Sequence, residues 1–236
     1  MIEDIPAEPL LLAEVDVLRD LPQSEVESLA RQCPMVHLAK KESLILGEYQ
    51  QGVFLLLSGR VRVHEPTTFG TQDLTFSVLE GGTVVGQPAF KPRPSRALLR
   101  VEALESSVLR MVGREDFEDL VLRNPRVGLK TMGLFGERLD EYEGRLSDIV
   151  RKEVPARLAG LLLRLSERED AMASDGERRI PVCYTHRLLA SIVGSNREAV
   201  TRAFGVLRQA GAVETRDRQI YVTDAAALAY FADAER

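Results

Sequence analysis

The stretch from Tyr184 to Leu207 constrains the fold of this chain more than any other. Apolar residues recur there with a period near 3.6 on both sides of Gly194. The apolar positions before the glycine are Leu189, Ile192 and Val193, and those after it are Val200, Ala203, Phe204 and Leu207. This pattern predicts two short helices joined by a tight turn.

The residues at the turn agree with this prediction. Gly194 can take the positive φ that such a turn requires, and Ser195 or Asn196 can cap the second helix. Small Ala190 lets the two helices approach closely. The spacing of Ala190, Gly194 and Val200 is that of a DNA-binding helix-turn-helix.

The second helix is expected to read base edges in a major groove. If Val200 points inward, the outward residues are Arg197, Glu198, Thr201 and Arg202. Arginine can bond guanine through two hydrogen bonds, and glutamate can accept one from cytosine N4. Neighbouring polar side chains are expected to position phosphates, namely Thr185, His186, Ser195, Asn196 and Thr201. The alternative is an ordinary helical hairpin whose Arg-Glu pair lies on a solvated face.

A β-hairpin is predicted directly after this motif. Gly211 suits the end of the second helix, and a short apolar run with Val213 follows it. A charged turn at residues 216–218 then leads to a second apolar run at residues 220–222. The two helices and the hairpin together therefore predict a winged helix-turn-helix.

The charge of the chain is distributed unevenly. The whole chain carries a net charge of −5. Residues 180–223 contain six arginines and three carboxylates, so this segment is +3 and the remainder is −8. A basic module on an acidic body suits sequence-specific DNA binding, because phosphate attraction is confined to one face.

Short alternating apolar runs separated by glycines fill residues 36–109. Examples of the runs lie at 43–46, 53–57, 60–63, 74–79 and 107–111, and the runs predict an antiparallel barrel or roll. Residues 1–13 are expected to form a loosely ordered arm, and a helix is expected to start at Ser24. The predicted fold class is α+β.

A heptad repeat lies between the two regions. Met132, Phe135, Leu139, Tyr142, Leu146 and Ile149 are separated alternately by three and four residues. This spacing predicts a long helix that pairs with a second copy; the alternative is that it packs on its own β-roll. Pro155 predicts a helix break, with a hinge at 150–154. Residues 157–165 are expected to form the next helix and 171–179 a polar loop.

Four runs resemble a known family. FLLLSGRVRV, LEGGTVVGQPAF and VEALESSVLRMVGREDFEDLVLRNPRV look like the cyclic-nucleotide-binding β-roll of the CRP/FNR regulators, and THRLLASIVGSNREAVTRAF is similar to their DNA-binding motif. The resemblance covers roughly residues 10 to 223. It implies a β-roll effector domain at 1–123, a dimerisation helix at 124–152 and a winged helix-turn-helix domain at 153–236. It also implies a homodimeric transcription regulator, with a TGTGA-like half-site and RNA polymerase as a partner in activation.

The same resemblance bears on the effector. In relatives that bind cyclic AMP, a glutamate takes the ribose hydroxyl and an Arg-Ser pair takes the phosphate. Here Gly86 and Arg96 fit the pattern, but Gln87 stands in place of the glutamate and Ala97 in place of the serine. Tyr142 and the residue after it replace the Thr-Ser pair that contacts adenine. We therefore expect weak or absent cyclic AMP binding. The other interpretation is a roll that senses another small molecule.

No metal, cofactor or enzyme activity is expected. Two distant cysteines, Cys33 and Cys183, cannot hold an iron-sulfur cluster, and the three histidines, His37, His64 and His186, form no catalytic motif with carboxylates. A redox role of either thiol stays open. No apolar run is long enough to cross a membrane, and the start of the chain lacks a basic signal, so a cytoplasmic protein is expected.

Overall fold

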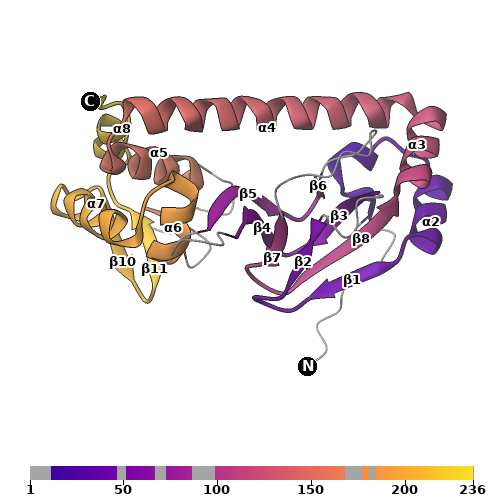
Figure 1. The fold of residues 1–236 in the computed structure, drawn as a ribbon, viewed down its shortest axis with the longest axis horizontal. Helices are drawn as coiled ribbons and strands as arrows, with labels where there is room; N and C mark the ends of the chain where they lie inside the picture. The colour runs from indigo at the N-terminus through magenta and orange to yellow at the C-terminus, as the bar shows by residue number, and fades with distance from the viewer. Residues whose placement is uncertain are drawn as a thin grey trace. The chain divides into compact units, whose positions relative to one another are not determined.

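The N-terminal part of the chain is an antiparallel β-roll with helices on one side (Figure 1). The computed structural model describes residues 12–46, 52–66, 73–86, 99–167, 177–180 and 184–235. Two four-stranded sheets have the orders β1-β8-β3-β6 and β2-β7-β4-β5. Their strands are β1 (Met35–Leu38), β2 (Ser43–Ile45), β3 (Gly52–Ser58), β4 (Arg60–Glu65), β5 (Leu74–Glu80), β6 (Thr83–Val85), β7 (Arg100–Ala103) and β8 (Ser107–Gly113). The predicted α+β class with a β-roll is confirmed.

Strand β3 is apolar on both faces because both of its faces are buried. Val53, Leu55 and Leu57 pack in a core with the helices η1 (Asp16–Leu18), α2 (Gln23–Gln32) and α3 (Arg114–Arg123). Phe54 and Leu56 alternate with them and pack in a second core, between the two sheets. The roll thus has three layers, which are the helices, the sheet that contains β3, and the second sheet.

The first described residues correct the predicted N-terminal arm. Residues 1–11 lie outside the described residues, but Leu12 and Val15 are fully buried in the core beneath the helices. Strands β1, β6 and β7 were not predicted either. Each has only three or four residues; β2 is as short, but its run at 43–46 contains three apolar residues in succession.

A buried arginine joins the roll to helix α2. Arg110, on β8, is only 3% exposed, and its Nη1 donates hydrogen bonds to the carbonyl oxygens of Ala30 (2.6 Å) and Cys33. These carbonyls belong to the end of α2, where backbone oxygens lack partners within the helix. The guanidinium therefore satisfies the end of α2 and carries a charge suited to its dipole.

Helix α4 runs unbroken from Pro125 to Arg151, a length of 27 residues. The described chain divides into two compact units, and the division falls inside this helix, between Leu139 and Asp140. Helix α5 (Val154–Ser166) follows, with Glu153 as its N-cap and a proline in its first turn. No helix among the described residues is long and apolar enough to cross a membrane.

The second unit contains two helices of a turn motif and a three-stranded sheet of order β10-β11-β9. Its elements after α5 are β9 (Arg178–Ile180), α6 (His186–Val193), α7 (Arg197–Gln209), β10 (Val213–Arg216), β11 (Gln219–Val222) and α8 (Ala225–Ala232). The loop expected at 171–179 is wrong at its end, because Arg178 and Arg179 belong to β9 and pair with β11. Helix α8 was not predicted; it packs against α5.

Candidate nucleic-acid interface

The turn between α6 and α7 is held by backbone geometry and one cap. Gly194 has φ 63° and ψ 48°, the left-handed region that side chains disfavour. Ser195 N donates to Ala190 O at 3.0 Å, and Asn196 Oδ1 accepts from Ala199 N at 2.8 Å. Of the two predicted caps, the structure therefore uses Asn196.

Helix α7 is sharply divided into a buried and an exposed face. Its buried residues are Val200, Ala203, Phe204 and Leu207. The exposed residues of its first two turns include Arg197, Glu198, Thr201 and Arg202. Two guanidinium groups, one carboxylate and one hydroxyl therefore share a solvent-facing surface at the start of the helix, and each can bond to a base edge.

A small polar cluster joins the starts of α6 and α7. Thr185 caps α6, since its Oγ1 accepts from Leu188 N at 3.2 Å. His186 Nδ1 lies 2.9 Å from Thr201 Oγ1, and that hydroxyl donates to Arg197 O at 2.9 Å. The imidazole also lies against Phe204, with ring centroids 5.3 Å apart. Burial, and then the charge of Arg197, lower the pKa of His186.

The β10-β11 hairpin forms a wing whose arginines have different surroundings. Arg216 is paired with Glu177 (2.7 Å) and Glu214, and its guanidinium lies 5.0 Å from the Tyr221 ring centroid. The hydrogen bond from Arg216 lowers the pKa of Glu177. Arg218 lies at the tip of the turn, exposed and with φ 65°. Arg216 thus ties the wing to residue 177, while Arg218 presents its charge to solvent.

The end of α4 contacts the turn motif within the second unit. A Cβ placed on Gly194 would lie 3.1 Å from Ile149 Cδ1, so the turn and the helix are in close contact. Arg157 Nη1, on α5, donates to Ile149 O at 3.2 Å. The last turn of α4 therefore helps to fix the position of the turn between α6 and α7.

The six residues of the predicted heptad seam differ in their exposure. Met132, Leu139 and Leu146 are 65%, 56% and 65% exposed, but Phe135 and Tyr142 are half-buried. Phe135 packs against the core of its own roll, and Ile149 contacts the turn motif. Leu129 and Val150 are also exposed and apolar, and their heptad spacing places them on the same side of α4 as Met132, Leu139 and Leu146. We call the α4 stripe the set Leu129, Met132, Leu139, Leu146 and Val150.

Of the four residues in the roll that were compared with a cyclic AMP site, the structure describes only the first, Gly86. Gly86 follows β6 with φ 92°, and Gln87, Arg96 and Ala97 lie outside the described residues. Beside β6, Arg138 of α4 donates from Nη2 to Thr83 Oγ1 (3.0 Å) and Val84 O (2.7 Å). The roll and the helix are thus joined directly by a guanidinium at this edge.

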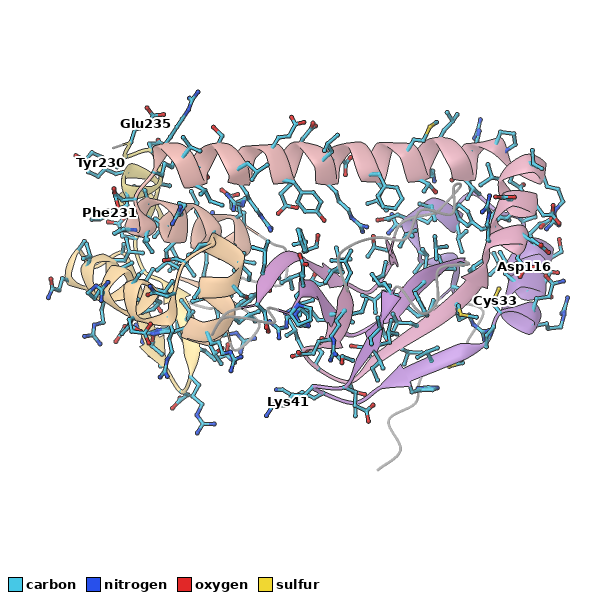
Figure 2. All side chains as sticks on the ribbon, in the orientation of Figure 1. Cys33, Lys41, Asp116, Tyr230, Phe231 and Glu235 are labelled. Carbon is cyan, nitrogen blue, oxygen red and sulfur yellow. The ribbon has the colours of Figure 1, made fainter. Side chains whose placement is uncertain are left out.

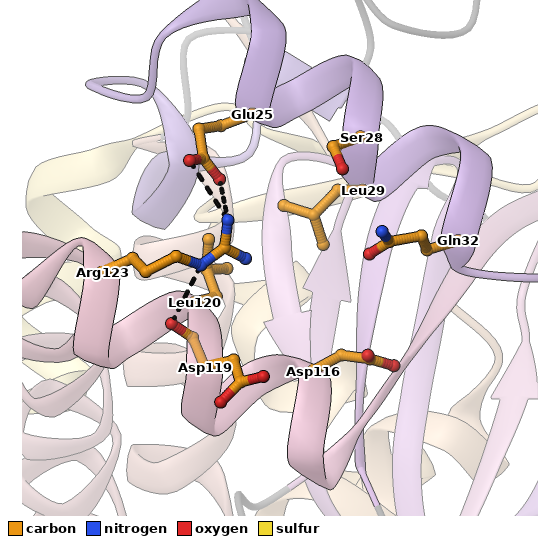
Figure 3. Close-up of a pocket in the computed structure, with 8 residues that line it drawn as sticks. All are labelled: Glu25, Ser28, Leu29, Gln32, Asp116, Asp119, Leu120 and Arg123. Carbon is orange, nitrogen blue, oxygen red and sulfur yellow. Dashed lines mark hydrogen bonds and ion pairs between the residues drawn. The ribbon is translucent and has the colours of Figure 1, made fainter.

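A pocket of about 220 Å³ lies between α2 and α3 (Figure 3). Its charged lining residues are Glu25, Asp116, Asp119 and Arg123. Arg123 is held by both carboxylate oxygens of Glu25, at 2.9 and 3.2 Å. The remaining carboxylates give the pocket a negative charge, which disfavours a phosphate-bearing ligand.

The described thiol is buried and has a raised pKa. Cys33 is buried at the end of α2 near Asp116 (Figure 2), and burial, followed by the negative charge of Asp116, raises the pKa of Cys33 to about 11. Cys183 lies outside the described residues. Over the described part of the chain, no group of three or more His, Cys, Asp or Glu side chains could hold a metal ion.

Comparisons with known proteins match both the motif and the whole chain. Residues 156–231 match the Crp-like helix-turn-helix domain family. The chain is 22% identical to a CRP-like cAMP-activated global transcriptional regulator of Mycobacterium tuberculosis, over 93% of this chain and 97% of the relative. It is 29% identical to the cyclic AMP receptor protein of Thermus thermophilus, over 77% and 80%. A CooA variant from Carboxydothermus hydrogenoformans has a similar fold, with a TM-score of 0.73 at 20% identity over 88% of this chain and 90% of that one.

Proposed function

The chain belongs to the CRP/FNR family of DNA-binding transcription regulators, and from that premise we propose that it binds a pseudo-palindromic operator as a homodimer. Each half-site is TGTGA-like. Binding depends little or not at all on cyclic AMP, and activation at suitable promoters proceeds through RNA polymerase.

The division of α7 into two faces carries the proposal. Four apolar side chains anchor the helix in its domain, so Arg197, Glu198 and Arg202 stand on the opposite side. In the proposed complex the arginines bond guanine O6 and N7, and Glu198 accepts from a cytosine N4–H. Exposed Thr185 and Asn196, half-buried Ser195, and Arg218 at the exposed wing tip contact phosphates.

The α4 stripe supports pairing with a second copy. Its five apolar side chains are more than half exposed, and their spacing places them on one side of the helix. Water is excluded from these side chains when an identical stripe packs against them, which supplies the free energy of association. Because α4 also contacts the turn motif through Ile149, pairing would hold two recognition helices about 34 Å apart, one turn of DNA.

Two observations support independence from cyclic AMP. The glutamate and serine expected of a cyclic AMP site are replaced by Gln87 and Ala97, and each lost partner in a buried site costs ~1–3 kcal/mol. The contacts of Arg138 with β6 join α4 to the roll through the protein's own side chain.

The relatives give a specific reason to keep a gated regulator as the second candidate. The Mycobacterium tuberculosis relative is described as cAMP-activated. In the gated form, a small molecule bound in the roll, either a cyclic nucleotide or another metabolite, raises the affinity for DNA. The two candidates share the same operator and dimer and differ only in their response to ligand.

Selection of bound sequences from a random DNA pool, with and without cyclic AMP, tests both candidates. We expect enrichment of paired TGTGA-like half-sites about one helical turn apart, in both pools equally. A tenfold or greater rise in operator affinity with micromolar cyclic AMP would instead establish the gated form. Failure to enrich any motif would overturn sequence-specific binding.

A further inference from the structure

The hydrogen bonds of Thr201 favour a neutral His186 whose single N–H points to Thr201 and not to solvent. Thr201 Oγ1 carries one proton, and that proton is donated to Arg197 O at 2.9 Å. The same oxygen lies 2.9 Å from His186 Nδ1, and it accepts at this contact while its own proton is bonded to Arg197 O. The neutral ring therefore carries its hydrogen on Nδ1, and Nε2 has a bare lone pair.

The position of the ring is fixed by its neighbours. Phe204, which is buried, lies against one side of the imidazole, and Thr201 holds its Nδ1 edge. Among the described residues, none is hydrogen-bonded to His186 Nε2, and the side chain is partly exposed. Nε2 is thus available at the start of α6, beside the exposed face of α7.

A bare lone pair repels a phosphate oxygen, whereas a protonated Nε2–H attracts it. We propose that each His186 takes up a proton from solvent when the protein binds DNA, and that the resulting imidazolium donates from Nε2 to a backbone phosphate. This inference rests on the proposed mode of DNA binding. It adds that the affinity for DNA depends on pH through His186 of each subunit.

The charges around the ring set the direction of the effect. From α7 it faces Arg197, and on α6 it precedes Arg187; its other α7 contacts, Thr201 and Phe204, do not titrate here. Burial and Arg197 lower the pKa of His186 below its ordinary value of 6.5, so they favour the neutral ring in the free protein. An adjacent phosphate raises the pKa, because it stabilises the charged ring. The complex therefore binds more protons than the free protein between the two pKa values, and affinity rises as pH falls.

The decisive measurement is operator affinity between pH 7.5 and 5.5, by fluorescence anisotropy at constant ionic strength. Wild type should bind more tightly as pH falls, by roughly tenfold for each unit by which DNA raises the pKa of one His186. His186→Gln should remove this dependence and bind as the wild type does at high pH. His186→Arg should bind tightly at all pH values, because its charge is permanent.

Two further variants test the geometry. His37→Gln, which removes an exposed histidine on β1, should keep the full pH dependence. Thr201→Val removes the oxygen that holds the Nδ1 hydrogen, so the neutral ring can turn its hydrogen to Nε2, and the pH dependence should become shallower. Nitrogen-15 NMR of the imidazole should show the Nδ1–H tautomer in free wild type and a raised pKa in the complex.

The outcomes separate this inference from the proposed function. Sequence-specific binding whose pH dependence is the same in His186→Gln as in wild type would overturn the proton linkage and leave the operator proposal intact. An Nε2–H tautomer in the free protein would also overturn it. No specific binding at any pH would overturn the proposed function itself.

Discussion

Helices α4 and α7 each leave a face exposed, and the chemistry of these two faces differs. The α4 stripe is made of leucine, methionine and valine side chains, whereas the exposed start of α7 carries Arg197, Glu198, Thr201 and Arg202. An apolar stripe gains free energy only by excluding water against another apolar surface. A row of donors and one acceptor gains little from such a surface and more from base edges and phosphates. The same secondary structure is therefore suited to two different partners.

The largest expected effect comes from charging the α4 stripe. In the proposed dimer, Leu146→Glu would place two like charges in an apolar interface, so that dimer should dissociate at micromolar concentration. Operator affinity should then fall by about 10² or more, because the two half-sites would no longer be bound as one event. Analytical ultracentrifugation and anisotropy measure the two effects. Leu122→Glu is the matched control, since Leu122 is 78% exposed but lies on α3 and is not part of the stripe; equal behaviour of the two variants would contradict the assignment of the interface.

The next effect concerns the α7 face. Arg202→Ala should cost ~1–3 kcal/mol of operator binding and relax preference at one base pair of each half-site, because a pair of hydrogen bonds to guanine is lost. Competition with operators substituted at single positions measures this preference. Arg208→Ala, in the last turn of the same helix, should leave the base preference unchanged. An unaltered base preference in the Arg202 variant would show that another face reads the DNA.

The contact between the two regions can be tested through the turn glycine. Gly194→Ala should lower the free energy of unfolding by ~1–2 kcal/mol, because the residue has φ 63° and its new Cβ would crowd Ile149. Gly205→Ala is the control: no atom lies within 4 Å of its new Cβ, and alanine favours a helix by up to ~1 kcal/mol over glycine. Urea denaturation should therefore move in opposite directions for the two variants.

The smallest effect is expected at the wing tip. Arg218→Ala should weaken binding to operator and scrambled DNA alike and reduce the slope of log affinity against log salt by about 1 for each subunit. Arg216→Ala should leave that slope nearly unchanged, because Arg216 is already paired with Glu177 and Glu214. A larger change of slope for Arg216 would mean that its ion pairs open on DNA.

Local patterns predicted the turn motif well. The period of the apolar residues and Gly194 predicted α6, the turn and α7, and the charged turn at 216–218 predicted the β10-β11 hairpin. The ion pair between Arg216 and Glu177 could not be predicted, because its partners are 39 residues apart and meet only when β9 joins the sheet. The cap provided by Arg110 to α2 was also missed, since it spans 77 residues.

The sequence alone determined that the chain has a β-roll, a long helix with a heptad repeat and a winged helix-turn-helix, because each is encoded by residues close to one another along the chain. Only the tertiary structure decided which side of α4 is free. Apolar residues spaced by 3 and 4 can form two neighbouring rows along a helix. Phe135 and Tyr142 belong to one row and are half-buried, whereas the α4 stripe is the other row and is exposed. The choice between the two rows depends on what else is folded against the helix, and that information is spread over residues far from it.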